Sequence, residues 1–322
     1  MKKFTFLTLL TLTFALAFAA QTPPPESGPT ANTDPDAAEI VSSDIELFWR
    51  AFDKAKPEND LIVFRDEYLK KGSVGLEEFR RLRIGNSCNL VAAIESHPKY
   101  YASLRKSTAK VDSFKPQIRA SFHRLKEIYP EAVFPNVYFL IGRMTSAGTL
   151  TDKGLLIGLD MFGRTEDFPV EEMNDWYKAV IASIDRVPFV VAHELIHYQQ
   201  KHPNDKHTLL SRSIGEGAAD FIGELISGSS INPHLHEYGN ARERELWLEF
   251  KKEMNGTDIS NWLYQGNDVK DKPADLGYYI GYKIAESYYR NAPDKNRAVK
   301  DILEIKDFEK FLAASGYEQK FK

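Results

Sequence analysis

Two histidines and a glutamate in the stretch VVAHELIHYQQ (190–200) have the residue types and the spacing of a metal site. His193 and His197 are four positions apart, so on a helix their imidazoles lie on one face and can point to a common ion. Glu194 directly follows the first histidine. Zinc binds imidazole and carboxylate groups and needs at least one more protein ligand than two histidines supply. The stretch therefore predicts two zinc ligands, His193 and His197, and requires a third from elsewhere in the chain.

The expected third ligand is a glutamate in the segment SIGEGAADFIGELISG (213–228). Glu216 lies nineteen positions after His197, at the distance at which a second helix can return to the first. The other common arrangement, a histidine six residues after the second one, is excluded because that position is Pro203. Small residues in the same segment allow its helix to approach the histidine helix closely. His193, His197 and Glu216 together predict one Zn²⁺ per chain.

An aspartate one turn further along the same helix is expected to support this site. Asp220 lies four positions after Glu216, on the same face, and can accept a hydrogen bond from the outer ring nitrogen of His193. Such a bond fixes the tautomer of a metal-binding histidine. The alternative is a buried helix pair in which Glu216 and Asp220 satisfy the two histidines without any metal.

The pattern of His193, Glu194 and His197, followed after eighteen intervening residues by Glu216, resembles the gluzincins, the clan of thermolysin and the one-zinc aminopeptidases. Other stretches, such as LIGLDMF, EGAADF and GYYIGYKIAESYY, are similar to a bacterial family of predicted zinc-dependent proteases of unknown role. The resemblance implies a zincin-like domain that hydrolyses peptide bonds with a zinc-activated water. It also implies that Glu194 is the general base, which takes the proton of that water.

A second oxyanion donor is expected from the segment DLGYYIGYKIAESYYR (275–290), because such donors stabilise the transition state of amide hydrolysis. Tyr278 is the residue that we select there as a further catalytic residue. The alternative is that its ring belongs to an aromatic core.

Three functions are therefore open from the sequence. The first is an exported zinc peptidase acting on a peptide or protein substrate. The second is a non-catalytic exported module for binding or assembly that keeps the fold, and the third is a zinc hydrolase of another amide, such as one in the cell wall. The intact Glu194 favours the peptidase, because a binding module has no chemical need for a base beside a metal ligand.

The N-terminus carries an export signal. Residues 1–19 combine two lysines, an apolar run and small residues, and predict a signal peptide that is cleaved after Ala19. The Pro-rich residues 20–37 predict a disordered leader, so the mature chain is expected in the periplasm or outside the cell. Cysteine is absent near the cleavage site, so a lipid-modified N-terminus is not expected. The single cysteine, Cys88, is expected to be a small buried side chain.

The remaining pattern predicts an α+β fold that is mainly helical, in one domain over residues 38–322. Residues 38–130 show helical periodicity, residues 131–165 contain two apolar runs typical of strands, and residues 170–322 are helical again. The two runs, 135–148 and 153–163, are expected to form two strands, and a hairpin with a long loop is one arrangement open to them. The second run is either an edge strand that an extended peptide joins or an interior strand.

Composition excludes some classes of partner. The formal net charge of −4, without a basic stripe, argues against nucleic-acid binding. No apolar stretch after the signal peptide is long enough to span a bilayer, so stable membrane insertion is not expected.

Overall fold

The computed structural model describes the chain from residue 31 onward, apart from residues 204–206, 267, 268 and 270. The predicted signal peptide, and the predicted leader as far as residue 30, lie outside the described residues. The described part is mainly helical and contains a four-stranded sheet, which confirms the predicted α+β class. The zincin-like detail and the single-domain division stay predictions.

The sheet joins four short strands in the order β1-β2-β4-β3. They are β1 (Ile40–Val41), β2 (Val137–Leu140), β3 (Gly148–Thr151) and β4 (Gly154–Gly158). β2 is parallel to both β1 and β4, whereas β3 is antiparallel to β4.

The predicted pair of strands exists, but its pairing differs from a hairpin. β2 and β4 are parallel neighbours, and the hairpin joins β4 to β3, which lies almost wholly in the stretch expected to be a loop. Thr149 and Thr151 are β-branched and suit a strand, and the two residues between β3 and β4 make the tight connection that an antiparallel pair allows. β4 is hydrogen-bonded on both sides, so it is an interior strand and not the edge strand that one interpretation proposed.

Helical segments fill most of the chain before β2, as predicted, but β1 lies in the same range and was not predicted. In α1 the apolar residues Ile45, Phe48 and Trp49 recur at helical spacing and are buried. Ser73 caps α3 through its side chain. The elements are α1 (Ser43–Lys54), α2 (Asp60–Val63), the π-helical η1 (Phe64–Leu69), α3 (Val74–Phe79), the π-helical η2 (Arg80–Ile84), α4 (Ser87–Ser96), α5 (Pro98–Thr108) and α6 (Val111–Ile128).

The folded part begins earlier than the predicted end of the leader at residue 37. The backbone oxygen of Asn32 accepts a hydrogen bond from Phe134 N at 2.7 Å, and the Asn32 side-chain amide donates to Phe134 O at 3.0 Å. Arg119 on α6 donates to the backbone oxygens of Pro35 and Ala38. These backbone contacts order residues 32–38, although their side chains are polar and small.

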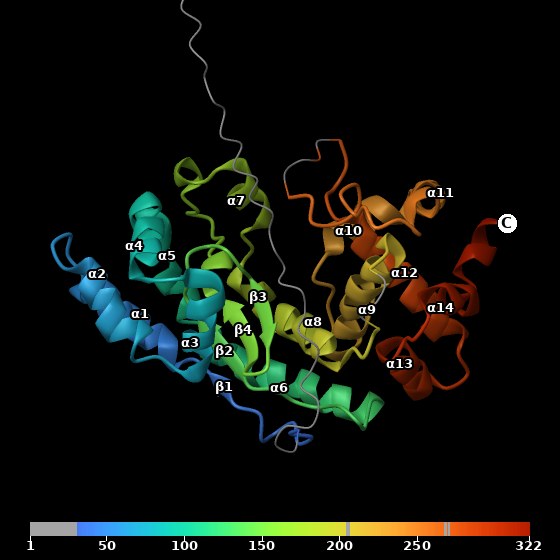
Figure 1. The fold of residues 1–322 in the computed structure, drawn as a ribbon, viewed down its shortest axis with the longest axis horizontal. Helices are drawn as coiled ribbons and strands as arrows, with labels where there is room; N and C mark the ends of the chain where they lie inside the picture. Colours follow the sequence, from blue (N-terminus) through green and yellow to red (C-terminus); the bar gives the residue numbers. More distant parts are fainter. Residues whose placement is uncertain (1–30, 204–206, 267–268, 270) are drawn as a thin grey trace, which may run out of the picture.

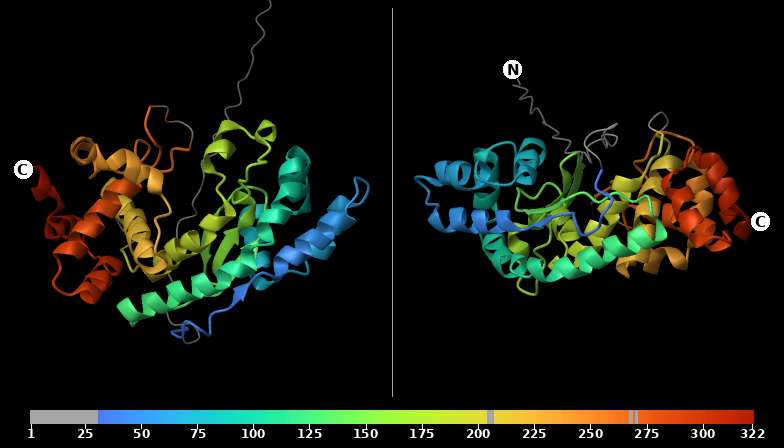
Figure 2. Two further views of the ribbon diagram at one scale, coloured as in Figure 1. Left: turned by 180° about the vertical axis from the view of Figure 1, so that it is seen from behind. Right: turned by 90° about the horizontal axis from the view of Figure 1, so that it is seen from below.

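The C-terminal half is helical, as predicted. Its elements are η3 (Leu159–Met161), η4 (Val170–Glu172), α7 (Asp175–Val180), η5 (Ile184–Arg186), α8 (Val187–Gln199), α9 (Leu209–Ser227), α10 (Pro233–Asn240), α11 (Glu243–Glu253), α12 (Leu276–Asn291), α13 (Lys295–Leu303), α14 (Phe308–Ser315) and η6 (Tyr317–Phe321). The first and last helices lie at opposite ends of the molecule, with the sheet and α8 between them (Figures 1 and 2). Within the part of the chain that the structure describes, every helix falls short of a membrane span in length or hydropathy.

Glycines let α9 pack closely against its neighbours. A Cβ on Gly223 of α9 would lie 3.3 Å from the backbone nitrogen of His193 on α8. The closest approach, however, is to α12: a Cβ on Gly217 would lie 2.0 Å from the backbone nitrogen of Tyr282, and one on Gly281 would lie 1.7 Å from Ser213 O. The small residues of the segment therefore serve two contacts, of which the sequence predicted only the one with α8.

Candidate metal centre

The two histidines lie on one buried face of α8. The helix begins at Val187 with Pro188 in its first turn, where a missing N–H removes no helical hydrogen bond. Most other residues of α8 are apolar and buried, so the helix runs through the core. The side chains of His193 and His197 are only 6% and 7% exposed. Water therefore does not solvate these two polar side chains, which is unusual.

The side chains of His193, His197 and Glu216 converge on one point, as predicted. The two Nε2 atoms are 2.9 Å apart, and Glu216 Oε2 lies 3.1 Å from His197 Nε2 and 3.5 Å from His193 Nε2. Tetrahedral zinc with bonds of about 2.0–2.1 Å places its ligand atoms about 3.3 Å apart. The three distances lie on either side of this value, so the residues fit a zinc ion with small adjustments. Among the described residues, this is the group of three that could hold a metal.

Outer polar contacts lie beside both rings. His193 Nδ1 lies 2.7 Å from Asp220 Oδ1, the contact that the sequence predicted, and Asn232 Nδ2 donates to the other oxygen of Asp220 at 2.8 Å. On the second ring, His197 Nδ1 lies 2.9 Å from Gln200 Oε1. The Gln200 amide is itself oriented, because its Nε2 donates to a backbone oxygen.

These outer contacts determine which nitrogen carries the proton. A carboxylate or an amide oxygen can only accept, so Nδ1 of His197 is the donor to Gln200, and the 2.7 Å contact with Asp220 favours a proton on Nδ1 of His193. In the neutral rings, the lone pairs of both Nε2 atoms then point at the place where an ion would bind. This protonation pattern is the one that metal-binding histidines need.

The charges of the cluster are strongly coupled. Burial lowers the pKa of His193, but the carboxylates of Asp220 and Glu216 outweigh that effect and raise it to about 10. The pKa of His197 is also raised, since Glu216 outweighs the effect of burial. For Glu216, burial raises the pKa, but the two histidines lower it well below its usual value. Without an ion the cluster therefore holds protons, which a metal would displace.

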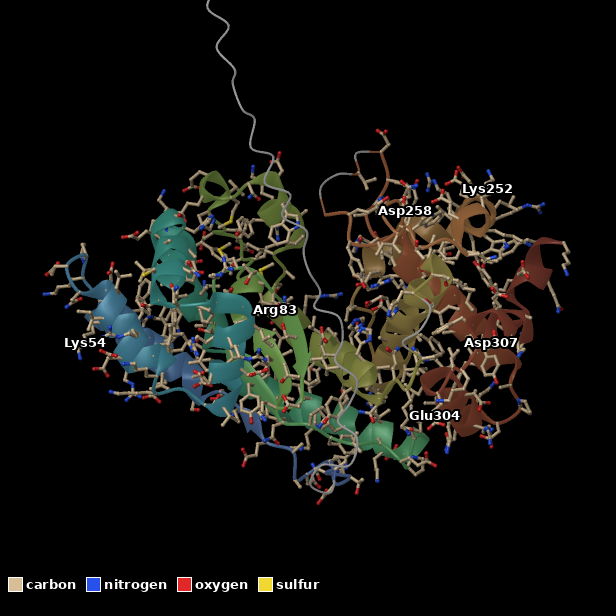
Figure 3. The ribbon with its side chains drawn as sticks, viewed as in Figure 1. Lys54, Arg83, Lys252, Asp258, Glu304 and Asp307 are labelled. Carbon is tan, nitrogen blue, oxygen red and sulfur yellow. The ribbon has the colours of Figure 1, made fainter. Side chains whose placement is uncertain are left out.

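Glu194 is buried beside the sheet and lies outside the group of three ligands. It is 7% exposed, and its carboxylate packs against Gly148 at the start of β3. A Cβ at Gly148 would lie 2.2 Å from Glu194 Oε1, so any larger residue there would displace this carboxylate. The carboxylate of Glu194 also acts on Arg83. Burial lowers the pKa of Arg83 from its usual value, and Glu194 offsets only part of this effect. Arg83 lies in the middle of the molecule (Figure 3).

Two tyrosines lie next to the ligands, and the sequence identified only one of them. Tyr278 on α12 places its ring 6.4 Å from the His193 ring, at 23° to its plane. Burial raises the pKa of Tyr278 well above its usual value. Tyr264, which the sequence analysis missed, donates its hydroxyl to Glu216 Oε1 at 2.7 Å. It lies 48 positions from Glu216, in a segment without a motif, so nothing in the sequence marked it.

Cys88 does not have the predicted environment. It is exposed on α4, because the buried face of this helix is formed by Leu90 and Val91 instead.

The comparison with known families decides between the functions left open. A family model described as Gliding motility protein GldB matches residues 30–319. The chain belongs to this family. Comparisons with curated proteins and with solved structures gave no match.

Membership in this family overturns the predicted peptidase. The gluzincin resemblance rests on about thirty residues, whereas the gliding motility family covers nearly the whole chain, and no peptidase family matches. The enzyme class and the peptidase function are therefore wrong, and a peptide substrate is not supported. No finding bears on Glu194 or Tyr278 individually, so their selection as site residues stays a prediction. The error has a physical reason, since residues that bind a metal do not by themselves establish turnover. Export agrees with the family, and the chain is an exported protein.

Proposed function

We propose that this protein is a non-catalytic binding or assembly module of a gliding motility apparatus. In this proposal it acts in the periplasm, its partners are proteins, and His193, His197 and Glu216 hold one zinc ion. The observation that carries the proposal is the convergence of these three side chains from two helices, in a chain of the gliding motility family.

The zinc would cross-link two helices. The ligands come from α8 and α9, and the outer partner Asn232 extends the same network to the turn before α10. A metal bound only by the folded protein adds its binding free energy to folding. Three protein ligands, moreover, leave a tetrahedral ion one position that a partner or water can occupy.

The metal part of the proposal is tested by elemental analysis of the mature chain, purified without added metal. We expect about one zinc per chain in the wild type and much less in His197→Ala and Glu216→Gln. The matched control is His202→Ala, because His202 is not one of the three cluster residues and its Nε2 lies 3.1 Å from Ile302 O. A wild-type chain that binds no zinc even after reconstitution would rule out the metal site.

The non-catalytic part is tested by complementing a gliding strain that lacks the gene. Glu194→Gln is nearly isosteric and removes the carboxylate to which the peptidase prediction gave the role of base. We expect this variant to restore movement as well as the wild type does, whereas His197→Ala restores it poorly. Loss of movement with Glu194→Gln, at normal zinc content and protein level, would contradict a non-catalytic module.

A further inference from the structure

A cavity of about 170 Å³ lies beside the metal centre and has no role in the function proposed so far. Its walls come from α7, from the loop between β2 and β3, and from the start of α12 with the turn before it. Most of the lining is apolar or aromatic, and these side chains are Ala147, Met161, Trp176, Val180, Tyr264 and Tyr278.

The cavity is separate from the metal centre but shares a wall with it. Tyr264 lines the cavity and donates its hydroxyl to Glu216, and Tyr278 lines it and faces the ring of His193. None of the three ligand residues lines the cavity. Occupation of the cavity and binding of zinc can therefore be tested independently.

The loop that forms one wall is held in place from two sides. The backbone oxygen of Arg83, in the π-helical η2, accepts hydrogen bonds from Arg143 Nε at 2.9 Å and from Thr145 Oγ1 at 3.3 Å. On the other side, the buried carboxylate of Asp160 accepts from Gly142 N at 2.6 Å. A wall fixed in this way does not have to be ordered when a ligand binds, which favours affinity.

The opposite wall is fixed by a second carboxylate. Asp275 Oδ1 accepts a hydrogen bond from Gln265 N at 3.0 Å, and the Gln265 side chain accepts from Asp275 N at 3.1 Å. Tyr264 and Asp275 both have left-handed backbones, with φ of 58° and 64°. Such conformations persist only where the surroundings enforce them. Asp275 is thus engaged in holding Gln265, the residue that follows Tyr264.

Arg83 is the cationic side chain among the residues that line the cavity. Its Nε donates to Thr149 Oγ1 at 2.8 Å, which fixes the guanidinium at the edge of the sheet. A planar guanidinium carries five N–H donors, so even with Glu194 acting on it Arg83 favours a carboxylate in a ligand over a neutral group.

We propose that this cavity receives one large apolar or aromatic side chain from an extended segment of an exported protein partner, with an acidic residue of that segment beside Arg83. The volume supports a side chain of a larger molecule, because cavities for free drug-sized ligands measure about 300–1,000 Å³. A single aromatic side chain buried in a preformed pocket is also how interfaces concentrate their binding energy. The inference rests on the proposed function as a binding module and names the chemistry of its partner.

The test uses the mature full-length chain and fluorescein-labelled, C-amidated octapeptides. Each peptide is built of alanine and serine, with one phenylalanine and one glutamate one to three positions away. Matched peptides replace the phenylalanine by alanine, or the glutamate by glutamine. Binding is measured by fluorescence anisotropy, with zinc content determined on the same protein.

Two variants and one control address the site. Ala147→Trp adds a large side chain to the lining of the cavity, to which none of the three ligand residues belongs, and Ala241→Trp adds the same side chain at an exposed position on the end of α10. Arg83→Gln removes the charge while the backbone oxygen that anchors the loop remains.

We expect the best phenylalanine–glutamate peptide to bind about ten- to a hundredfold more tightly than its alanine match, the ratio for burying one aromatic side chain. Replacing glutamate by glutamine should weaken binding to the wild type by about three- to tenfold and leave binding to Arg83→Gln unchanged. The affinity of Ala147→Trp for the best peptide should be lower by at least about tenfold, and Ala241→Trp should bind this peptide like the wild type.

Equal binding of the phenylalanine and alanine peptides, or full binding by Ala147→Trp, would overturn the inference. The two proposals fail in different ways. Peptide binding that depends on Ala147 in a chain without zinc would contradict only the metal site. Zinc-loaded protein that binds no peptide of the set at concentrations up to about 1 mM would contradict only the cavity.

Discussion

Two buried carboxylates in this molecule are held by different partners, and the difference explains their opposite chemistry. Asp160, just after β4, accepts hydrogen bonds from the backbone amides of Gly142 and Met144. Backbone amides carry no net charge, so burial dominates and raises the pKa of Asp160 to about 6. Glu216 on α9 faces two imidazoles that can be protonated, and its pKa is lowered in spite of burial.

Burial alone therefore does not indicate where a metal site lies. The carboxylate at the sheet holds a loop in place, whereas the carboxylate on α9 lies where positive charge is stabilised. An ion with two positive charges fits the second environment and not the first. Four predictions test this contrast, in order of decreasing expected effect.

Removal of zinc should have the largest effect on stability. If zinc is present at about a thousand times its Kd, its loss should cost about 4 kcal/mol in free energy of unfolding. The measurement is urea unfolding with and without a strong chelator. Glu216→Gln should be equally stable with and without the chelator. A wild type that is also equally stable in both conditions would contradict a zinc cross-link between the helices.

Asp160 should make stability fall as pH rises, since its pKa is higher in the folded state than the usual 3.8. Below about pH 4 the Asp160 carboxyl is protonated in the folded and in the unfolded protein. Above this pH the carboxyl ionises first in the unfolded chain, and this ionisation favours unfolding. Stability is thus lost between pH 4 and about 6, by about 3 kcal/mol in total. Relative to Asp160→Asn, wild-type protein in chelator should lose this amount across the interval. Parallel curves for the two proteins would contradict the assignment.

Asn232→Ala should weaken zinc binding by about ten- to a hundredfold, the usual cost of losing an outer partner of a metal ligand. Without this amide, one oxygen of Asp220 loses its donor, and the carboxylate orients His193 less firmly. Competition with a chromophoric chelator measures the affinity. The control is Asn240→Ala. Asn240 accepts a hydrogen bond from the Tyr279 hydroxyl and has no hydrogen bond to any of the three ligand residues, so its loss should leave zinc affinity unchanged.

Tyr264→Phe should have the smallest effect, about 1 kcal/mol in zinc affinity or about fivefold, because it removes one hydrogen bond to Glu216. The ring stays, so the wall of the cavity keeps its shape. The same competition assay applies. An effect as large as that of Asn232→Ala would mean that the tyrosine hydroxyl does more than hold the carboxylate.

The metal-site geometry was predictable because short-range rules determine it. His193 and His197 share a helix face at any point in a helix, and Glu216 with Asp220 follows the same rule one helix later. Tyr264 and Asn232 were not predictable, since they reach the cluster from turns whose direction depends on the packing of the whole chain.

Function was the least predictable property. His193, Glu194 and His197 describe the chemistry of a few atoms, and the same atoms serve catalysis in one protein and structure in another. The strand β3 was missed for a related reason, since Thr149 and Thr151 have strand propensity but too few apolar neighbours to stand out. In both cases the residue types suit the feature, metal binding or a strand. Their role, however, depends on residues elsewhere in the chain.

The crossing of α9 and α12 has a mechanical consequence. Where Gly217 and Gly281 bring the two backbones together, no side chain lies between them that could reorient under load. Soft contacts deform gradually because rotamers adjust, but two backbones in direct contact either stay together or separate. In the role proposed above, this pair of helices would be a stiff element that transmits force without yielding gradually.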